Sequence, residues 1–171
     1  MATSEKGHEG SNGVASMSEE QEEQVVFQPL AQYVKDLSFE NPNAPESLTK
    51  QGVNPKFEMN FQLDARLAGD DTYEVVLQVN LDAKHENDYI YKLELAYAGL
   101  FLIKGLPEDI LKKVLLVECP ALIFPFLRQK ITTQIQDGGY PPFQMDLINF
   151  AQLYEENQAH QAEAKEDKTV N

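Results

Sequence analysis

Apolar and polar residues alternate along the middle of the chain, a pattern typical of half-buried β-strands. The alternation predicts four strands, over residues 27–40, 56–68, 72–83 and 89–104. Turn-forming residues at 69–71 and a polar segment at 84–88 separate the last three strands and predict two hairpins. The first connection, of roughly fifteen residues, is longer than the usual connection of about 4–6 and indicates a functional loop or a sheet crossover.

The spacing of apolar residues becomes helical after the fourth strand. Pro107-Glu108-Asp109 is typical of a helix start, because proline suits the first turn and acids favour the positive end of the helix dipole. A second helix is expected to begin after Cys119-Pro120 and to end at Gly138-Gly139. After a stiff aromatic loop, Tyr140-Pro141-Pro142-Phe143, Asn149 predicts the cap of a short last helix. The predicted fold class is α+β, a four-stranded antiparallel sheet with helices packed on one face.

The fourth predicted strand is long enough to need more cover than one chain offers. Its residues, 89–104, would span about 50 Å at roughly 3.3 Å per residue. The run 121–127 is apolar on more than one helix face, which is typical of a buried helix, and otherwise of a groove or a subunit interface. We therefore expect an oligomer with Leu93, Leu95 and Tyr97 at its interface, and we expect Leu95→Asp to split it.

Acidic residues outnumber basic residues two to one. The chain has 14 Lys+Arg and 28 Asp+Glu, a formal net charge of -14. Residues 1–24 and 158–171 are acidic and have too little apolar surface to offset the entropy lost on ordering, so both are predicted to be disordered tails. One domain is expected between them, over residues 25–157.

The charge and the apolar pattern exclude several classes of partner. Nucleic acids and anionic lipid headgroups bind Lys and Arg, so both are poor partners for this acidic chain, whereas a basic protein partner or client suits its negative electrostatic field.

The sequence has no basic-then-apolar leader and no apolar run near about 18 residues, so we expect no signal peptide and no membrane span. Cys119 is the only cysteine, which excludes an intramolecular disulfide. The expected location is the cytoplasm.

Motifs for catalysis and metal binding are absent from the sequence. It contains no glycine-rich phosphate loop, no GxSxG and no HExxH. His8, His85 and His160 are far apart and have no metal-ligand spacing. Asp70-Asp71 is typical of a turn, and Cys119, inside an apolar run with no histidine nearby, is typical of a buried structural thiol. We expect no enzyme activity, no metal and no cofactor.

Several motifs follow one another in the order found in a known family. They are Lys35-Asp36-Leu37-Ser38-Phe39-Glu40, Asn41-Pro42-Asn43-Ala44-Pro45, Asp70-Asp71-Thr72-Tyr73-Glu74-Val75-Val76-Leu77, Gly99-Leu100-Phe101, Cys119-Pro120, Ile123-Phe124-Pro125 and Asn149-Phe150. Over residues 26–158 the chain resembles the bacterial protein-export chaperone family SecB.

The resemblance implies a tetramer, a dimer of dimers of four-stranded antiparallel sheets faced by helices. It also implies an ATP-independent holdase without an active site, which keeps precursor proteins unfolded and delivers them to the SecA motor ATPase. The family's positions for SecA docking correspond here to Asp36, Glu40 and Glu94. The alternation agrees, because Asp36 and Glu40 share the polar side of the first strand and Glu94 alternates with Leu93 and Leu95.

Two residues depart from the family pattern. Lys92 stands on the same side as Glu94, at a position where the family usually has an apolar residue, which predicts a weaker or differently shaped docking surface. Val53, in the first connection, stands where many members have Trp, which predicts a smaller aromatic wall for the client groove and a changed client preference.

Apolar residues between the sheet and the helices are expected to form grooves for extended, unfolded clients. The expected groove residues are Phe57, Met59, Phe61, Leu127, Ile131, Phe150 and Leu153. For each of them, a sealed core position is an equal alternative. Two other functions stay open: a SecB-like chaperone for a cytosolic client such as a toxin–antitoxin system, and a small α+β ligand-binding enzyme.

Overall fold

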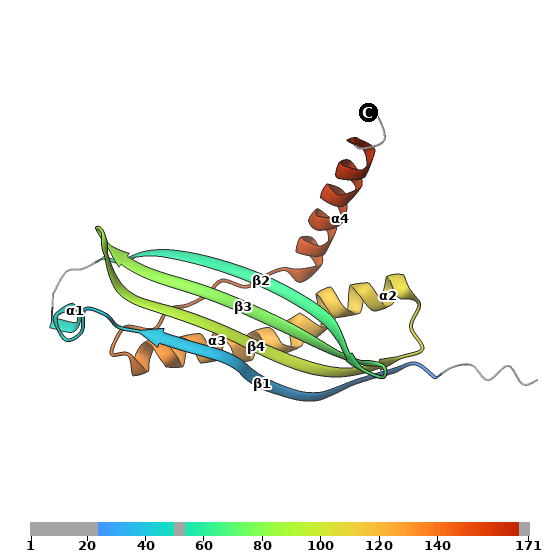
Figure 1. The fold of residues 1–171 in the computed structure, drawn as a ribbon, viewed down its shortest axis with the longest axis horizontal. Helices are drawn as coiled ribbons and strands as arrows, with labels where there is room; N and C mark the ends of the chain where they lie inside the picture. The colour runs from blue at the N-terminus through green and yellow to red at the C-terminus, as the bar shows by residue number, and fades with distance from the viewer. Residues whose placement is uncertain (1–23, 50–53, 168–171) are drawn as a thin grey trace, which may run out of the picture.

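The computed structural model describes residues 24–49 and 54–167, with side chains described as far as residue 160. Its strands are β1 (Val26–Glu40), β2 (Lys56–Gly69), β3 (Thr72–His85) and β4 (Asp88–Lys104). They form one antiparallel sheet in the order β1-β4-β3-β2 (Figure 1). The predicted α+β fold is confirmed, and each predicted strand is present.

Tight turns join the last three strands. β2 and β3 are connected through Asp70 and Asp71, and Asp71 has a positive φ of 53° that a short polar side chain tolerates. β3 and β4 are connected through Glu86 and Asn87, with a φ of 54° at Glu86. The first connection is different, because it carries α1 (Glu46–Thr49) and crosses from β1 at one edge of the sheet to β2 at the other. Both predicted hairpins and the predicted crossover are therefore present.

Three helical segments follow β4, and each continues directly into the next. They are α2 (Glu108–Lys113), the π-helical segment η1 (Val114–Glu118) and α3 (Cys119–Asp137). The predicted separation into two helices at Cys119-Pro120 is wrong. Pro120 has no N–H to bond the carbonyl four residues earlier, and the wider π turn before it carries the helix past this position.

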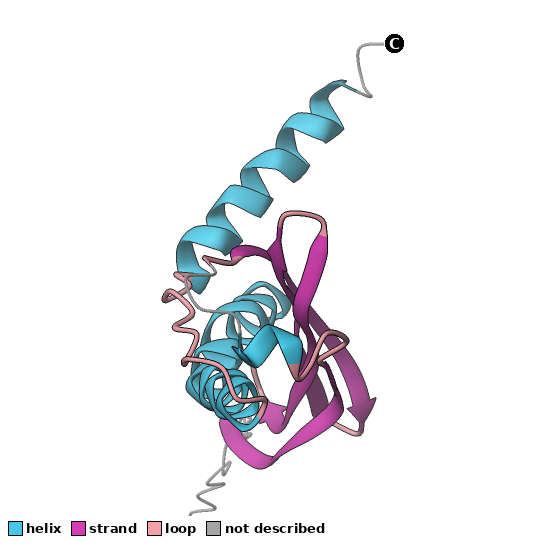
Figure 2. Ribbon diagram, turned by 90° about the vertical axis from the view of Figure 1, so that its left-hand side faces the viewer, coloured by secondary structure: helices cyan, strands magenta, loops and turns pink. Residues whose placement is uncertain are grey.

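The last helix, α4 (Phe150–Asp167), projects away from the sheet and from α3 (Figures 1 and 2). Its predicted cap is confirmed, since Asn149 Oδ1 accepts a hydrogen bond from the Gln152 N–H at 3.1 Å. Its predicted length is wrong: the helix continues past Gln158, where the sequence predicted a disordered tail. The alanines, glutamates and lysine of this stretch are strong helix formers, and their preference outweighs the lack of apolar cover. The predicted N-terminal tail lies outside the described residues, apart from Gln24.

The core lies between α3 and one face of β3 and β4, the two layers that Figure 2 shows end-on. Every fourth residue of α3 faces the sheet and is 0% exposed: Ile123, Leu127, Ile131 and Ile135. Gly99 of β4 lets the helix come close, since a Cβ at Gly99 would lie 2.6 Å from the Phe101 ring and 2.9 Å from Ile123 Cγ2. α3 therefore seals the middle of the sheet.

The predicted oligomer interface needs correction. Leu93 and Leu95 are 1% and 2% exposed in the single chain, and Tyr97 is 6% exposed. All three lie on the helix-facing side, where Leu95 pairs with Val79 and Leu93 with Leu81. Leu93 and Leu95 are core residues beneath α3, so Leu95→Asp would disturb folding of the chain before it disturbed any assembly.

We predict that Leu95→Ala lowers the free energy of unfolding by about 2–5 kcal/mol, because truncating a packed core leucine leaves a cavity. Urea denaturation followed by far-UV circular dichroism measures the change. Leu67→Ala is the matched control, because Leu67 lies on the same side of the sheet but is 63% exposed, and its effect should stay within about 0.5 kcal/mol. Equal losses at the two positions would contradict the core assignment of Leu95.

Candidate functional site: an apolar groove and an acidic sheet face

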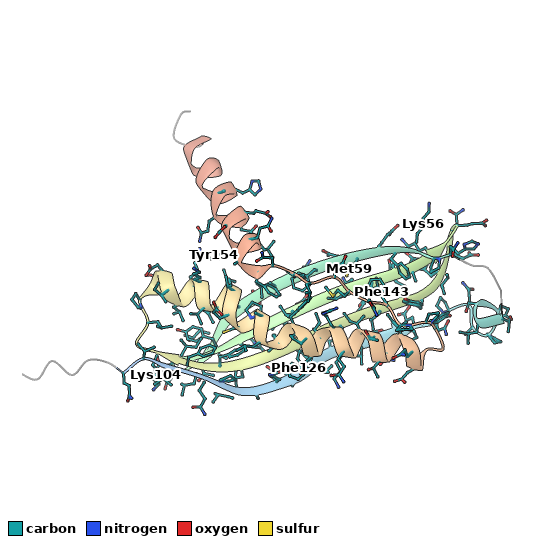
Figure 3. All side chains as sticks on the ribbon, turned by 180° about the vertical axis from the view of Figure 1, so that it is seen from behind. Lys56, Met59, Lys104, Phe126, Phe143 and Tyr154 are labelled. Atoms are coloured by element: carbon teal, nitrogen blue, oxygen red, sulfur yellow. The ribbon has the colours of Figure 1, made fainter. Side chains whose placement is uncertain are left out.

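The helix-facing side of β2 carries large apolar side chains that α3 leaves uncovered. Phe57 and Met59 are each 45% exposed, and Phe61 is half-buried. The Phe57 ring contacts the Phe143 ring with centroids 5.0 Å apart, and Figure 3 shows Met59 and Phe143 on this side of the sheet. We use the name β2 groove for the surface formed by Phe57, Met59, Phe61 and the two cavities beside them.

The first cavity of the β2 groove has a volume of about 610 Å³ and lies between β2, the first connection and the segment after α3. Its apolar and aromatic walls include Leu48, Pro55, Phe57, Tyr91, Tyr140 and Phe143. The polar side chains that line it, Ser47, Asn54 and Gln144, are uncharged. Burial raises the pKa of Tyr91 to about 12, so its phenol is neutral as well. A cavity of this size and chemistry suits apolar side chains of an extended segment.

Tyr140 ties two walls of this first cavity together. Its hydroxyl donates to Asn41 Oδ1 at 2.6 Å, so in the 2.8 Å contact with Ser47 the Ser47 hydroxyl is the donor. Asn41 Nδ2 adds a longer hydrogen bond, 3.4 Å, to the Gly138 carbonyl. These bonds hold the first connection against the end of α3 and so maintain the width of the cavity.

The second cavity of the β2 groove, about 440 Å³, lies farther along β2, beside α4. Phe61 and Leu63 of β2 line one wall, and Leu153 and Tyr154 of α4 line another; Figure 3 labels Tyr154 near the start of α4. Lys112 also lines this cavity, so its chemistry is less apolar than that of the first cavity.

Three of the predicted groove residues are sealed in the core. Leu127 and Ile131 are 0% exposed, and Phe150 is 5% exposed. Phe150 packs between aromatic rings, with its centroid 6.2 Å from Phe61 and 5.5 Å from Phe124. The predicted groove surface is therefore wrong for Leu127, Ile131 and Phe150, which support the groove from below. The open positions are Phe57, Met59, Phe61 and Leu153.

The sequence prediction missed the wall that the first connection and residues 140–143 build. The Tyr-Pro-Pro-Phe motif was visible as a stiff aromatic loop, but no local pattern tells which strand such a loop meets. Leu48 was missed because its short helix, α1, has no periodic pattern of its own. Val53 lies outside the described residues, so the effect of a smaller side chain there stays a prediction.

The acids predicted for docking lie together on the opposite side of the sheet, the side turned to the viewer in Figure 1. Ser38 of β1 pairs with Glu94 of β4. Asp36 and Glu40 flank Ser38 at two residues to either side, so both are diagonal neighbours of Glu94. All three carboxylates are exposed, and together they form what we call the acidic face: Asp36, Glu40 and Glu94.

Lys92 lies in the next row of this side of the sheet. It pairs with Glu40 of β1 and with Asp82 of β3, and Asp82 pairs in turn with Glu58 of β2. The Lys92 ammonium lies 5.0 Å from the centroid of the Tyr89 ring, a cation–π distance. The neighbouring acids Asp82 and Glu58 were missed because only the strand register reveals them.

A nearly covered carboxylate lies on the same side of the sheet. Glu74 is 3% exposed, and the side chains that bind it provide its cover. It accepts hydrogen bonds from the Tyr33 hydroxyl, from Lys35 Nζ at 2.8 and 2.9 Å and from Arg66 Nε at 2.6 Å. The hydrogen bond from Lys35, followed by those from Tyr33 and Arg66, lowers the pKa of Glu74 to about 2. The cluster of Tyr33, Lys35, Arg66 and Glu74 therefore joins β1, β2 and β3 through an ionised carboxylate.

Cys119 matches its prediction as a buried thiol. It is 0% exposed, and burial raises its pKa to about 12. Among the side chains described, those of residues 24–49 and 54–160, no three His, Cys, Asp or Glu are placed to hold a metal ion. None of the described helices is long and apolar enough to cross a membrane.

The fold and these two surfaces define an α+β binding protein with an apolar groove on one side of its sheet and acids on the other. A family profile described as preprotein translocase subunit SecB matches residues 20–161. The protein-export protein SecB of Bartonella bacilliformis is 44% identical over 133 residues, which cover 78% of this chain and 84% of that protein. The protein-export protein SecB of Afipia carboxidovorans is 42% identical over 142 residues, which cover 83% of this chain and 88% of that protein. The chain belongs to the SecB family.

A solved structure has the same fold. It is the Mycobacterium tuberculosis Rv1957 SecB-like chaperone in complex with a ChAD peptide from the Rv1956 HigA1 antitoxin, with a TM-score of 0.59 and 14% sequence identity. The match covers 71% of this chain and 90% of that chain. The predicted family membership is confirmed by the profile and the relatives, and the predicted fold by this structure.

Proposed function

We propose that this SecB-family chain is an ATP-independent holdase of protein export. It binds unfolded precursor proteins, works as a homotetramer in the cytoplasm and delivers its clients to the SecA motor ATPase, without catalysis and without a cofactor. The observation that carries the proposal is the exposed aromatic lining of the β2 groove in a chain with relatives named protein-export protein SecB. Those names favour an export client over a toxin–antitoxin client or a small-molecule substrate.

The shape and chemistry of the β2 groove support binding of an extended segment. From Phe57 to Leu63 the strand covers about 20 Å at roughly 3.4 Å per residue, enough for a client segment of about six residues. β2 is an edge strand, so one row of its backbone N–H and C=O groups is left for such a segment. The uncharged walls of the first cavity place few demands on client sequence, which suits a chaperone with many clients.

We predict that Phe57→Ser weakens binding of a reduced, unfolded precursor about tenfold, because losing about 1.4 kcal/mol of apolar contact is a tenfold change. Fluorescence anisotropy of the labelled precursor measures the affinity. Leu67→Ser is the matched control, since Leu67 lies on the same strand and the same side but lines neither cavity. Unchanged affinity in Phe57→Ser, in a protein that melts normally, would remove this surface from the client site.

A second apolar surface, along β1 and the adjacent side of α3, supports assembly. Its large apolar residues are each 40–47% exposed: Phe27, Leu30, Val34, Leu37, Leu122 and Phe126. Figure 3 shows Phe126 on the side of α3 next to β1, and a hollow of about 410 Å³ lies between Leu30, Tyr97 and Phe126. β1 is also an edge strand, so this surface offers a second copy both apolar contacts and free backbone groups. Of the three residues first assigned to the interface, Tyr97 stays a candidate.

We predict that Phe126→Asp reduces the sedimentation mass below that of the tetramer, because a charge buried in an apolar interface costs several kcal/mol. The control is Leu147→Asp, since Leu147 is 78% exposed and lies outside the apolar surface along β1 and α3. Analytical ultracentrifugation at micromolar concentration measures both variants. A stable monomer for the unmodified protein would contradict the proposed tetramer.

The charge of the acidic face supports docking of a basic partner segment. Asp36, Glu40 and Glu94 are exposed within one patch of a chain with a net charge of -14. Exposed ion pairs are worth only about 0.2–1 kcal/mol each, so affinity should come from several acids together and from long-range steering. Lys92, close to Glu40, reduces the local negative charge and should moderate the affinity for SecA.

We predict that Asp36→Lys and Glu94→Lys each weaken SecA binding about tenfold at low salt, while tetramer mass and client binding stay unchanged. The affinity of the unmodified protein should fall with added salt, because the Debye length shrinks from about 10 Å at 0.1 M to about 3 Å at 1 M. Titration calorimetry measures the affinities, and Glu108→Lys on α2 is the control for a charge reversal away from the acidic face. If the Glu108 variant loses as much affinity as the others, net charge rather than this patch directs docking.

A further inference from the structure

Glu74 binds a lysine that borders the acidic face. Lys35 directly precedes Asp36 in β1, and its ammonium lies 2.8 Å from the Glu74 carboxylate. The side chain of Lys35 is 40% exposed, whereas that of Glu74 is 4% exposed. The lysine is thus partly accessible, and the contact with Glu74 determines where its charge lies.

A β-bulge explains why Lys35 reaches this side of the sheet. Regular alternation would place Lys35 on the helix-facing side, opposite to Asp36. The register shifts between Val34 and Asp36, so Lys35 is the extra residue and is left without a partner on β4. Because its ammonium binds Glu74, two consecutive residues of β1, one basic and one acidic, serve the same face.

We infer that Glu74 is a positioning residue for the acidic face: it holds the Lys35 ammonium away from Asp36, so that the docking acids keep their negative charge for a basic partner. The inference rests on the proposed docking of SecA at these acids. Without the Glu74 carboxylate, the nearest acid along the chain for Lys35 is Asp36. An ion pair between the two would neutralise one of the three docking charges.

Glu74 also binds Arg66, but Arg66 is less able than Lys35 to neutralise the docking acids when Glu74 is lost. The hydrogen bond with Glu74 raises the pKa of Arg66, and the Asp64 carboxylate raises it further by a smaller amount. Arg66 therefore keeps an acidic neighbour on β2 when Glu74 is lost. Loss of Glu74 therefore changes the charge near Asp36, Glu40 and Glu94 mainly through Lys35.

The test compares Glu74→Gln with the double variant Glu74→Gln/Lys35→Gln in calorimetric titrations of purified SecA. Glu74→Gln should weaken SecA binding about threefold to fivefold at low salt, equal to about 0.6–1 kcal/mol by the tenfold-per-1.4 relation, and should reduce the salt dependence of the affinity. Client affinity and tetramer mass should not change. The double variant should regain the unmodified affinity for SecA, because no free ammonium remains beside Asp36.

The rescue separates the inference from a purely structural role of Glu74. If Glu74→Gln weakens SecA binding and the double variant does not restore it, the cluster supports the sheet and the inference is wrong. If Asp36→Lys weakens SecA binding but Glu74→Gln does not, SecA docks at the acidic face, and Glu74 is not needed to hold Lys35 away from it. If Asp36→Lys also has no effect, the proposed docking site itself is wrong.

Lys35→Gln alone tests the inference in a chain that keeps Glu74, should Glu74→Gln fail to fold. Because Glu74 already matches the lysine charge, removing that charge should change SecA affinity by less than about twofold. A rise of threefold or more would show that Lys35 neutralises the docking acids even in the presence of Glu74, which overturns the inference.

Discussion

Packing of α3 against one face of the sheet is the contact on which the rest of the structure depends. Ile123, Leu127 and Ile131 pack against alternate residues of β3 and β4, so every second side chain of these central strands lies in the core. A slip of one residue in either strand would exchange the two faces, and the buried side therefore fixes the register. The acids on the opposite side are placed by this core, although none of them touches it.

The width of the covering layer explains where the apolar surfaces lie. A helix with its side chains is about 10 Å wide, enough for two strands spaced about 4.8 Å apart, and α3 lies over β3 and β4. The edge strands β1 and β2 therefore keep apolar side chains such as Leu37 and Phe57 partly exposed. One edge suits a second copy of the chain, and the other suits an unfolded client held against residues 140–143.

The outer side of the sheet combines two kinds of charge. Around Glu74 the charges are paired and covered, which ties β1, β2 and β3 together across β4. Around Glu94 the carboxylates are exposed and separated by polar neighbours such as Ser38 and Asn80. Paired charges add to the stability of the sheet, whereas exposed ones remain free to attract a basic partner. The bulge at Lys35 is where the two regions meet, so the arrangement of this one residue affects both.

By itself, the sequence determined the strands, the two faces of β2, β3 and β4, the hairpins and the family, because alternation, turn residues and motifs are local properties of the chain. It also placed Asp36, Glu40 and Glu94 on one polar side. In β1, two bulges place Tyr33 and Lys35 on the side away from α3, opposite to the side that alternation predicts. Tertiary structure alone decided that Leu93, Leu95 and Leu127 are sealed, that the helix continues through Pro120, and that residues 140–143 form a wall of the groove. A local pattern shows to which side a residue points, but exposure depends on how far a helix from elsewhere in the chain extends over it.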